Sequence, residues 1–131
     1  MKEWSRKWKG SKSPKKQRKY SRNIPLHMRK SLLSVNLSKE LRKSYLRRNI
    51  PIKTGDKVRV LRGQFRKKEG KVTGINRKLK VYVDGVELVK KDGTKVHYPM
   101  HPSNLQIIDL NITDKKRKKA IERNIGGSKN G

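Results

Sequence analysis

The chain has 131 residues, of which 31% are apolar and 37% charged, and its formal net charge is +28. This length suits one small domain with extensions, and so few apolar residues exclude a large buried core. A charge density this high repels itself unless a polyanion neutralises it, which indicates a nucleic acid as partner. The net charge is +15 in residues 1–50, +8 in residues 51–112 and +5 in residues 113–131. We therefore expect the centre to fold by itself and both ends to depend on the partner.

Several classes of protein are disfavoured by residue content. The chain has no cysteine, which excludes disulfides, thiolate zinc sites and cysteine nucleophiles. No apolar run approaches the ~18 residues of a membrane span. The basic N-terminus also lacks the apolar stretch of a signal peptide. We expect a soluble, intracellular chain without a membrane partner.

Residues 1–23 combine cations and serines with Trp4, Trp8 and Tyr20, and show no helical or strand periodicity. Low hydrophobicity with high charge predicts an extended tail without structure of its own. Aromatic rings among cations suit stacking on bases while the cations contact phosphates. We expect this tail to order on RNA, although the tryptophans could instead pack on a neighbouring protein. Its predicted RNA-binding residues are Lys15, Lys16, Arg18, Lys19, Tyr20 and Arg22.

Two short helices are predicted in residues 24–50. Pro25 precedes the segment LHMRKSLL, and Ser38 is a suitable N-cap for a second helix that carries a glutamate in its first turn. Pro51 is expected to end this second helix by restricting the residue before it. Both helices are expected to pack on the central domain.

Residues 51–112 are predicted to be β. Val58 and Val60 alternate with cations, and further alternating runs follow up to Leu110. An Asp-Gly pair at Asp92 is typical of a tight hairpin turn. About five short strands in this range predict a mainly β fold, a small SH3-like barrel with flanking short helices and basic extended tails.

A basic loop at residues 62–69 follows the first strand and holds four cations, one carboxylate and Phe65. Phe65 could stack on a base, meet another protein, or pack beneath its own loop. The glycines expected to have structural roles in positive-φ turns or close chain approaches are Gly55, Gly70 and Gly85. The cations expected to bind RNA at one rim of the barrel are Lys57, Arg59, Arg62, Arg66, Lys67, Lys68 and Lys71, with a second patch at Arg77, Lys78 and Lys80.

Residues 113–131 are predicted to form a C-terminal helix and a flexible tail. Thr113 or Asp114 is a suitable N-cap, and Gly126 and Gly127 are expected to end the helix.

Catalytic and metal-binding patterns do not fit. Six residues separate Gly63 from Gly70, where a phosphate-binding P-loop needs four, and Val72 stands where it needs serine or threonine. His97 and His101 are separated by a proline corner and have no obvious third metal ligand. The acids are dispersed, and those beside glycine or in turns are interpreted as turn residues that bond to backbone: Asp56, Asp84 and Asp92. We expect no enzymatic activity, no metal and no cofactor.

Alternating apolar residues around a central glycine, followed by a basic strand, resemble the KOW motif. The likeness extends beyond this motif to KELRKSY at residues 39–45 and to DGVELVKKDGTKVHYPMHPSNLQIIDLNITDKKRKKAIER at residues 84–123. Over residues 14–124 the chain resembles the archaeal and eukaryotic family of large-subunit ribosomal protein twenty-four.

The resemblance implies a structural constituent of the cytoplasmic large ribosomal subunit that binds the 5′ domain of its rRNA. It also implies a role early in subunit assembly and a position near the polypeptide exit. The implied partners are large-subunit rRNA, neighbouring ribosomal proteins and factors acting on nascent chains at the exit, and no homo-oligomer is expected. Two alternatives are a KOW-type transcription elongation or adaptor module, and a non-specific DNA-compacting protein, which would not account for the β centre.

Overall fold

The computed structural model describes residues 4–8 and 10–127. It divides into two compact units, residues 1–32 and residues 33–131, which are described separately below. Strands and a few short helices make up the described residues, so the prediction of a mainly β fold with flanking helices is confirmed. The ends of both predicted tails, residues 1–3 and 128–131, lie outside the described residues, as does residue 9.

The first unit contains two helices, α1 (Pro14–Asn23) and α2 (Leu26–Leu32). The extended conformation expected for residues 1–23 is therefore wrong for the α1 segment. Pro14 occupies the first turn of α1, where its fixed φ favours a helix and its missing N–H costs nothing. Ile24, which precedes Pro25, is extended and ends α1. Neither helix contains a buried residue, so this unit has little core of its own.

The second unit is built on a six-stranded sheet with the strand order β2-β1-β8-β3-β4-β5. The β1–β8 pair is parallel and the other pairs in this sheet are antiparallel. The six strands are β1 (Ser34–Leu37), β2 (Asn49–Pro51), β3 (Lys57–Val60), β4 (Glu69–Ile75), β5 (Val81–Val83) and β8 (Leu105–Asp109).

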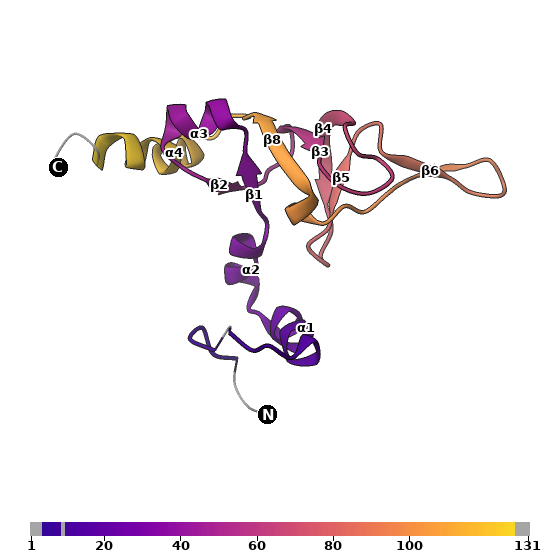
Figure 1. The fold of residues 1–131 in the computed structure, drawn as a ribbon, viewed down its shortest axis with the longest axis horizontal. Helices are drawn as coiled ribbons and strands as arrows, with labels where there is room; N and C mark the ends of the chain where they lie inside the picture. Colours follow the sequence, from indigo (N-terminus) through magenta and orange to yellow (C-terminus); the bar gives the residue numbers. More distant parts are fainter. Residues whose placement is uncertain (1–3, 9, 128–131) are drawn as a thin grey trace. The chain divides into compact units, whose positions relative to one another are not determined.

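A separate two-stranded arm, β6 (Glu87–Val89) and β7 (Lys95–His97), extends beyond β5 (Figure 1). Asp92 accepts hydrogen bonds from the Thr94 backbone N–H and hydroxyl at its tip, and Gly93 has a φ of +86°. The predicted Asp-Gly hairpin turn is confirmed.

The sheet begins at Ser34, well before the expected start of the β region at residue 51. In the short run SVNL, Val35 and Leu37 are fully buried while their neighbours are half-buried, which is strand alternation over too few residues to stand out between two helices. β2 then pairs antiparallel to β1 and buries Ile50.

The helix between these strands is α3 (Lys39–Tyr45). The Ser38 hydroxyl accepts a hydrogen bond from the backbone N–H of Leu41 at 3.4 Å, so the predicted N-cap is confirmed. The expectation that Pro51 ends this helix is wrong. α3 ends at Leu46, which takes a left-handed φ of 51°, because the chain must turn back here to place β2 beside β1.

The core of the second unit follows the predicted alternation. Val58 and Val60 are buried and the cations between and before them are exposed. Residues from β1, β8 and β5 fill the remaining space, and Ile121 of the last helix joins them. Burial of these apolar side chains is the main favourable term in the stability of so small a unit.

That last helix is α4 (Lys115–Gly127), which lies beside α3 (Figure 1). Asp114 accepts a hydrogen bond from the Lys116 N–H at 2.9 Å, which confirms the predicted cap, and also pairs with the Lys53 ammonium. The helix ends at Gly127, so the prediction that Gly126 and Gly127 end it is confirmed. The Arg47 guanidinium donates to the carbonyl of Ala120 at 2.8 Å and links α4 to the end of α3.

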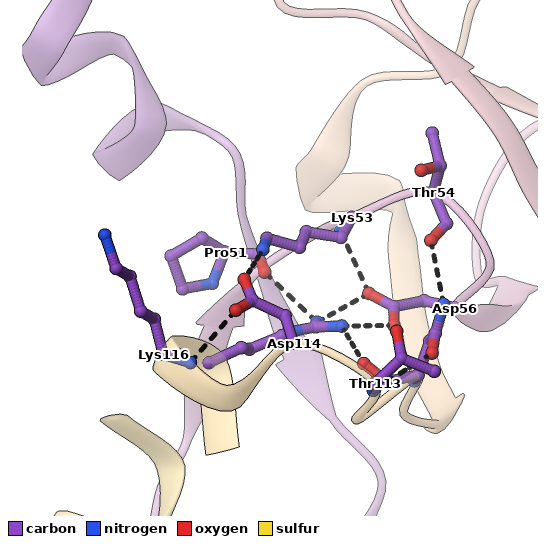
Figure 2. A network of polar contacts seen from close by, with 9 residues as sticks. Pro51, Lys53, Thr54, Asp56, Thr113, Asp114 and Lys116 are labelled. Atoms are coloured by element: carbon purple, nitrogen blue, oxygen red, sulfur yellow. Dashed lines mark hydrogen bonds and ion pairs between the residues drawn. The ribbon is translucent and has the colours of Figure 1, made fainter. Parts of the chain in front are cut away.

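A buried ion pair joins α4 to the sheet. Both carboxylate oxygens of Asp56 contact the two terminal nitrogens of Arg117 at 2.6 Å, and both side chains are almost fully buried. The same oxygens accept the backbone N–H groups of Lys53 and Asn111 at 2.9 Å each. Arg117 also donates to the carbonyls of Asn111 and Pro51. Figure 2 shows Asp56, on the loop before β3, with contacts to Lys53 on the same loop and to the segment that leads into α4.

The three glycines expected to be structural have different roles. Gly55 and Gly85 take positive φ values of +90° and +78°, which favour glycine. Gly70 does not, but a Cβ there would lie 2.2 Å from the backbone oxygen of Asp84. Of the two possibilities raised for Gly70, close chain approach is therefore the one realised.

Candidate nucleic-acid interface

The five predicted cations of α1 are all exposed, and Tyr20 is half-buried. Helical spacing places residues three and four apart on one face, which gathers positive charge along the helix. A cleft of about 430 Å³ runs between the helix's own cations and is lined by Lys15, Arg18, Lys19, Arg22 and Asn23. No acidic residue occurs between positions 4 and 32, so these cations have no carboxylate within their own unit's described residues.

The basic loop between β3 and β4 has a defined conformation. Lys67 has a φ of 72°, its N–H donates to the Val60 carbonyl at 2.9 Å, and the Val60 N–H donates to the Lys68 carbonyl at 2.9 Å. Phe65 is buried and its ring lies 5.2 Å from that of Tyr98, with the Lys68 ammonium above it. Of the roles considered for Phe65, packing beneath its own loop is the one observed.

With Phe65 as its anchor, the loop holds its charged side chains outward. A fixed backbone reduces the conformational entropy lost on binding a polyanion. The exposed cations that the structure brings together on this loop are Arg62, Arg66, Lys67 and Lys68.

The second predicted patch lies on the turn between β4 and β5. Its backbone closes through hydrogen bonds between Asn76 and Lys80 at 2.8 Å and between Leu79 and Asn76 at 2.9 Å. Arg77 and Lys78 are exposed at the tip, whereas Lys80 is half-buried. This turn therefore presents a smaller positive surface than the basic loop.

Two of the predicted rim cations are engaged with a carboxylate. Arg59 donates twice to Glu69 across the β3–β4 ladder, at 2.6 and 2.8 Å, and the Lys57 ammonium lies 3.7 Å from the same carboxylate. The Arg59 guanidinium is the main cause that holds the pKa of Glu69 below its usual value. Lys71, opposite Lys57 on β4, is exposed. The sheet face is thus less positive than the count of lysines and arginines suggested.

Exposed cations outside the predicted set extend the basic surface of the second unit. The two largest groups are five on α4 and three on the β6–β7 arm. The high charge of residues 113–131 was visible in the sequence. In the arm no strand residue is buried, so alternation carried no signal for its lysines. The cations of these two groups are Lys115, Lys116, Lys118, Lys119, Arg123, Lys90, Lys91 and Lys95.

The buried Asp56–Arg117 pair was missed by sequence reasoning, which interpreted Asp56 as a turn residue. The available signal was the spacing of Arg117 and Ile121, four apart on α4, which puts an arginine on the apolar face of a basic helix. A cation on such a face needs a buried partner.

The histidines have structural contacts. His101 hydrogen-bonds the Ser103 hydroxyl at 2.7 Å and accepts the Ser103 N–H, which caps a short 3₁₀ helix at Pro102–Asn104. Burial, and secondly the charge of Lys80, hold the pKa of His101 below its ordinary value. His97 lies 3.8 Å from Glu87 across the arm.

Residues 4–8 and 10–127 contain no group of three or more histidine, cysteine or acidic side chains that could hold a metal ion. In the same residues, no helix is long and apolar enough to cross a membrane.

Comparison with known proteins decides the family. Residues 11–124 match the family model that describes the eukaryotic L26 ribosomal proteins together with their archaeal counterparts, ribosomal protein twenty-four. The chain belongs to this ribosomal protein family. It is 43% identical over 116 residues to a protein of Methanosphaera stadtmanae named large ribosomal subunit protein uL24, covering 88% of this chain and 99% of that one. A protein of the same name from Nanoarchaeum equitans is 49% identical over 121 residues, covering 92% and 81%.

Family membership confirms several predictions. The resemblance to large-subunit ribosomal protein twenty-four is confirmed, and with it a structural, non-enzymatic constituent of the cytoplasmic large ribosomal subunit. The match over most of the chain also favours the ribosomal interpretation over an elongation module or a DNA-compacting protein.

Proposed function

We propose that the chain binds large-subunit rRNA through three groups of exposed cations, those of α1, of the basic loop and of the β4–β5 turn. The observation that carries this proposal is the anchored basic loop. Phe65 is buried beneath it, the backbone is hydrogen-bonded to β3, and four cations are exposed on it. A lone run of charge is usually a solvated surface, whereas charge held on a rigid loop is organised for a partner.

Phosphate contacts of these cations would position the protein, and the shape of the folded RNA would supply selectivity. Arginine and lysine side chains suit phosphate oxygens, and arginine can bind them through two parallel hydrogen bonds. Binding to the 5′ domain of the rRNA, early action in assembly and a location near the polypeptide exit belong to this proposal. Their support is the family membership. Neighbouring ribosomal proteins and factors acting on nascent chains are the further partners proposed.

The test is selective retention of large-subunit rRNA over duplex DNA by the purified chain at about 0.3 M salt, where non-specific phosphate binding is strongly weakened. A variant with Arg66, Lys67 and Lys68 replaced by glutamine should bind rRNA more weakly. Its log–log salt dependence should be lower by about 2 to 3, at roughly 0.7 to 0.9 per lost contact. Its melting temperature should change only slightly, because these side chains are exposed and only Lys68 contacts the buried ring of Phe65.

The matched control replaces the same number of exposed cations on the β6–β7 arm, Lys90, Lys91 and Lys95. If both variants lose the same affinity, binding depends on charge alone and the role given to the loop is wrong. Equal retention of rRNA and duplex DNA by the unchanged chain would contradict the proposed function itself.

A further inference from the structure

The first unit contains a second cleft, of about 550 Å³, lined by aromatic as well as cationic residues. Trp4 and Tyr20 contact each other there, with ring centroids 5.0 Å apart and the planes tilted by 35°. Its volume is in the range of small-ligand sites in proteins. The lining residues are Trp4, Ser5, Trp8, Lys16, Lys19, Tyr20 and Asn23.

Trp8 is exposed to an unusual degree for so large an apolar ring, at 51% of its surface. Trp8 lines the cleft, so a partner that enters it would remove this exposed indole from water. Because indole offers a broad π-face, a flat aromatic partner gains most from stacking on it.

The charge around the cleft indicates which class of flat ligand fits. Lys16 and Lys19 line it, Lys19 also lines the neighbouring cationic cleft, and no acidic residue occurs between positions 4 and 32. Such surroundings favour a ligand whose ring is attached to phosphates over an apolar or basic protein side chain.

We propose that this cleft binds one unpaired nucleobase of RNA, stacked on the indole of Trp8, while Lys16 and Lys19 contact the adjoining phosphates. Stacking of a base on an aromatic side chain adds to affinity with little dependence on sequence. The inference rests on the proposed rRNA binding. It adds a contact that recognises the base of an unpaired nucleotide, in addition to the contacts that recognise phosphate charge.

The chain offers a direct optical test, because it has two tryptophans and both line the cleft. Tryptophan fluorescence of the full-length protein therefore reports on this site. A short oligoadenylate should quench it as the complex forms. Inorganic polyphosphate, which has the charge but no bases, should bind without comparable quenching. Equal quenching by both would overturn the proposal.

Variants make the test quantitative, with affinity measured by filter retention. Trp8→Ala should lower affinity for oligoadenylate by about 5- to 150-fold, the range expected for one stacked base, and leave affinity for polyphosphate unchanged. Trp8→Phe, which keeps an aromatic ring, should retain most of the affinity. The matched control is Leu26→Ala, another exposed apolar residue of this unit, 80% exposed and outside the cleft, which should behave like the unchanged chain.

The inference is wrong if Trp8→Ala binds oligoadenylate as tightly as Leu26→Ala does. It is also wrong if Trp8→Ala binds RNA normally but fails to enter large subunits, because Trp8 would then contact a protein. These results are separable from failure of the proposed function. If the unchanged chain retains rRNA and Trp8→Ala binds oligoadenylate normally, the nucleobase site alone is disproved. If the unchanged chain fails to retain rRNA, the broader proposal is disproved.

Discussion

The two units of this chain differ in how far their positive charge is offset by carboxylates and by a buried apolar core. In residues 33–127, a sheet buries an apolar core, one arginine is neutralised inside it by Asp56, and Glu69 engages Arg59 and Lys57 on its surface. In residues 4–32, two short helices bury none of their residues and no carboxylate side chain is present. From this comparison we predict that the second unit is stable by itself and that the first becomes stable on binding a polyanion.

The length of α1 supports this difference. Isolated helices shorter than about 12 residues are only marginally stable in water, because the free-energy cost of forming the first turn exceeds the gain from a few hydrogen bonds. α1 has 10 residues, half of them lysine or arginine, and its N-cap serine makes no side-chain hydrogen bond. Phosphates along its exposed face would relieve the repulsion between its cations.

The largest effect on stability is expected from Arg117→Met. It leaves the carboxylate of Asp56 buried without its main partner, and breaking a buried ion pair in this way costs about 3 to 5 kcal/mol of unfolding free energy. Urea denaturation measures the loss. The matched control is Arg123→Met, an exposed cation on the same helix, which should change stability by less than about 0.5 kcal/mol.

A double variant, Asp56→Asn with Arg117→Met, should be more stable than Arg117→Met alone, because it removes the unpaired buried charge and keeps a side-chain oxygen that can accept one of the Lys53 and Asn111 N–H groups. If Arg117→Met is no more harmful than Arg123→Met, the buried pair does not hold α4 to the sheet.

The opposite behaviour is expected in the first unit. Replacing Lys15, Lys19 and Arg22 by glutamine should leave the unfolding transition of the sheet unchanged. The log–log salt dependence of rRNA binding should fall by about 2 to 3, because three phosphate contacts are lost. Denaturation and salt-dependent retention measured on one preparation give both numbers. A stability loss comparable to that of Arg117→Met would remove the distinction between the units.

Gly70→Ala should lower the unfolding free energy of the second unit by about 1 to 3 kcal/mol, because the new methyl group meets the Asp84 backbone oxygen. Gly74→Ala on the same strand is the control. Its Cβ would lie 3.8 Å from the nearest atom, an ordinary contact, so thermal melting should change much less. Equal melting temperatures for the two variants would show that the backbone near Gly70 and Asp84 can move apart to accept a methyl group without loss of stability.

Glu69→Gln should strengthen rRNA binding by about two- to fivefold at low salt, because it releases Arg59 and Lys57 from a surface ion pair of small net strength. Affinity titrations at two salt concentrations test this, and the gain should shrink as salt rises. Asp92→Asn removes a carboxylate from the tip of the arm and serves as the control for net charge. Unchanged affinity for Glu69→Gln would mean that the β3–β4 face does not contact RNA.

The smallest expected effect is the change in the stability of the fold at acid pH. Arg59 lowers the pKa of Glu69 from its ordinary 4.5, and Lys53 lowers the pKa of Asp114 from its ordinary 3.8. A carboxyl group with a depressed pKa in the folded state stabilises the fold above its unfolded pKa, and that contribution is lost as pH falls through the folded value. Urea midpoints should therefore begin to fall below about pH 4.5. The fall should be shallower in a Glu69→Gln, Asp114→Asn double variant, and identical pH profiles would contradict these pairings.

The strands of residues 57–109 could be predicted because Val58, Val60 and their equivalents alternate with cations over enough residues to be recognised. β1 could not, since four residues of alternation between two helices carry too little signal. The helix α1 was also missed. The composition of this segment is typical of disorder, and it hid the helix-favouring effect of a proline at the first turn.

For the candidate site, most of the cations singled out from the sequence are exposed, with Lys80 half-buried, but the sequence did not indicate which of them are already paired. Arg59 and Glu69 face each other only because of the β3–β4 register, and Asp56 meets Arg117 across a long stretch of chain. Such contacts between distant residues depend on the tertiary fold, which local patterns do not specify. The burial of Phe65 is of the same kind, because Tyr98 comes from far along the sequence.

Hydrogen–deuterium exchange of the full-length chain, free and bound to large-subunit rRNA, tests the difference between the two units most directly. We predict that amides of β3, β4 and β8 are protected in both states, whereas amides of α1 exchange rapidly in the free protein and become protected on RNA. Protection of α1 equal to that of the sheet in the free protein, or no gain in α1 protection on binding, would contradict the account.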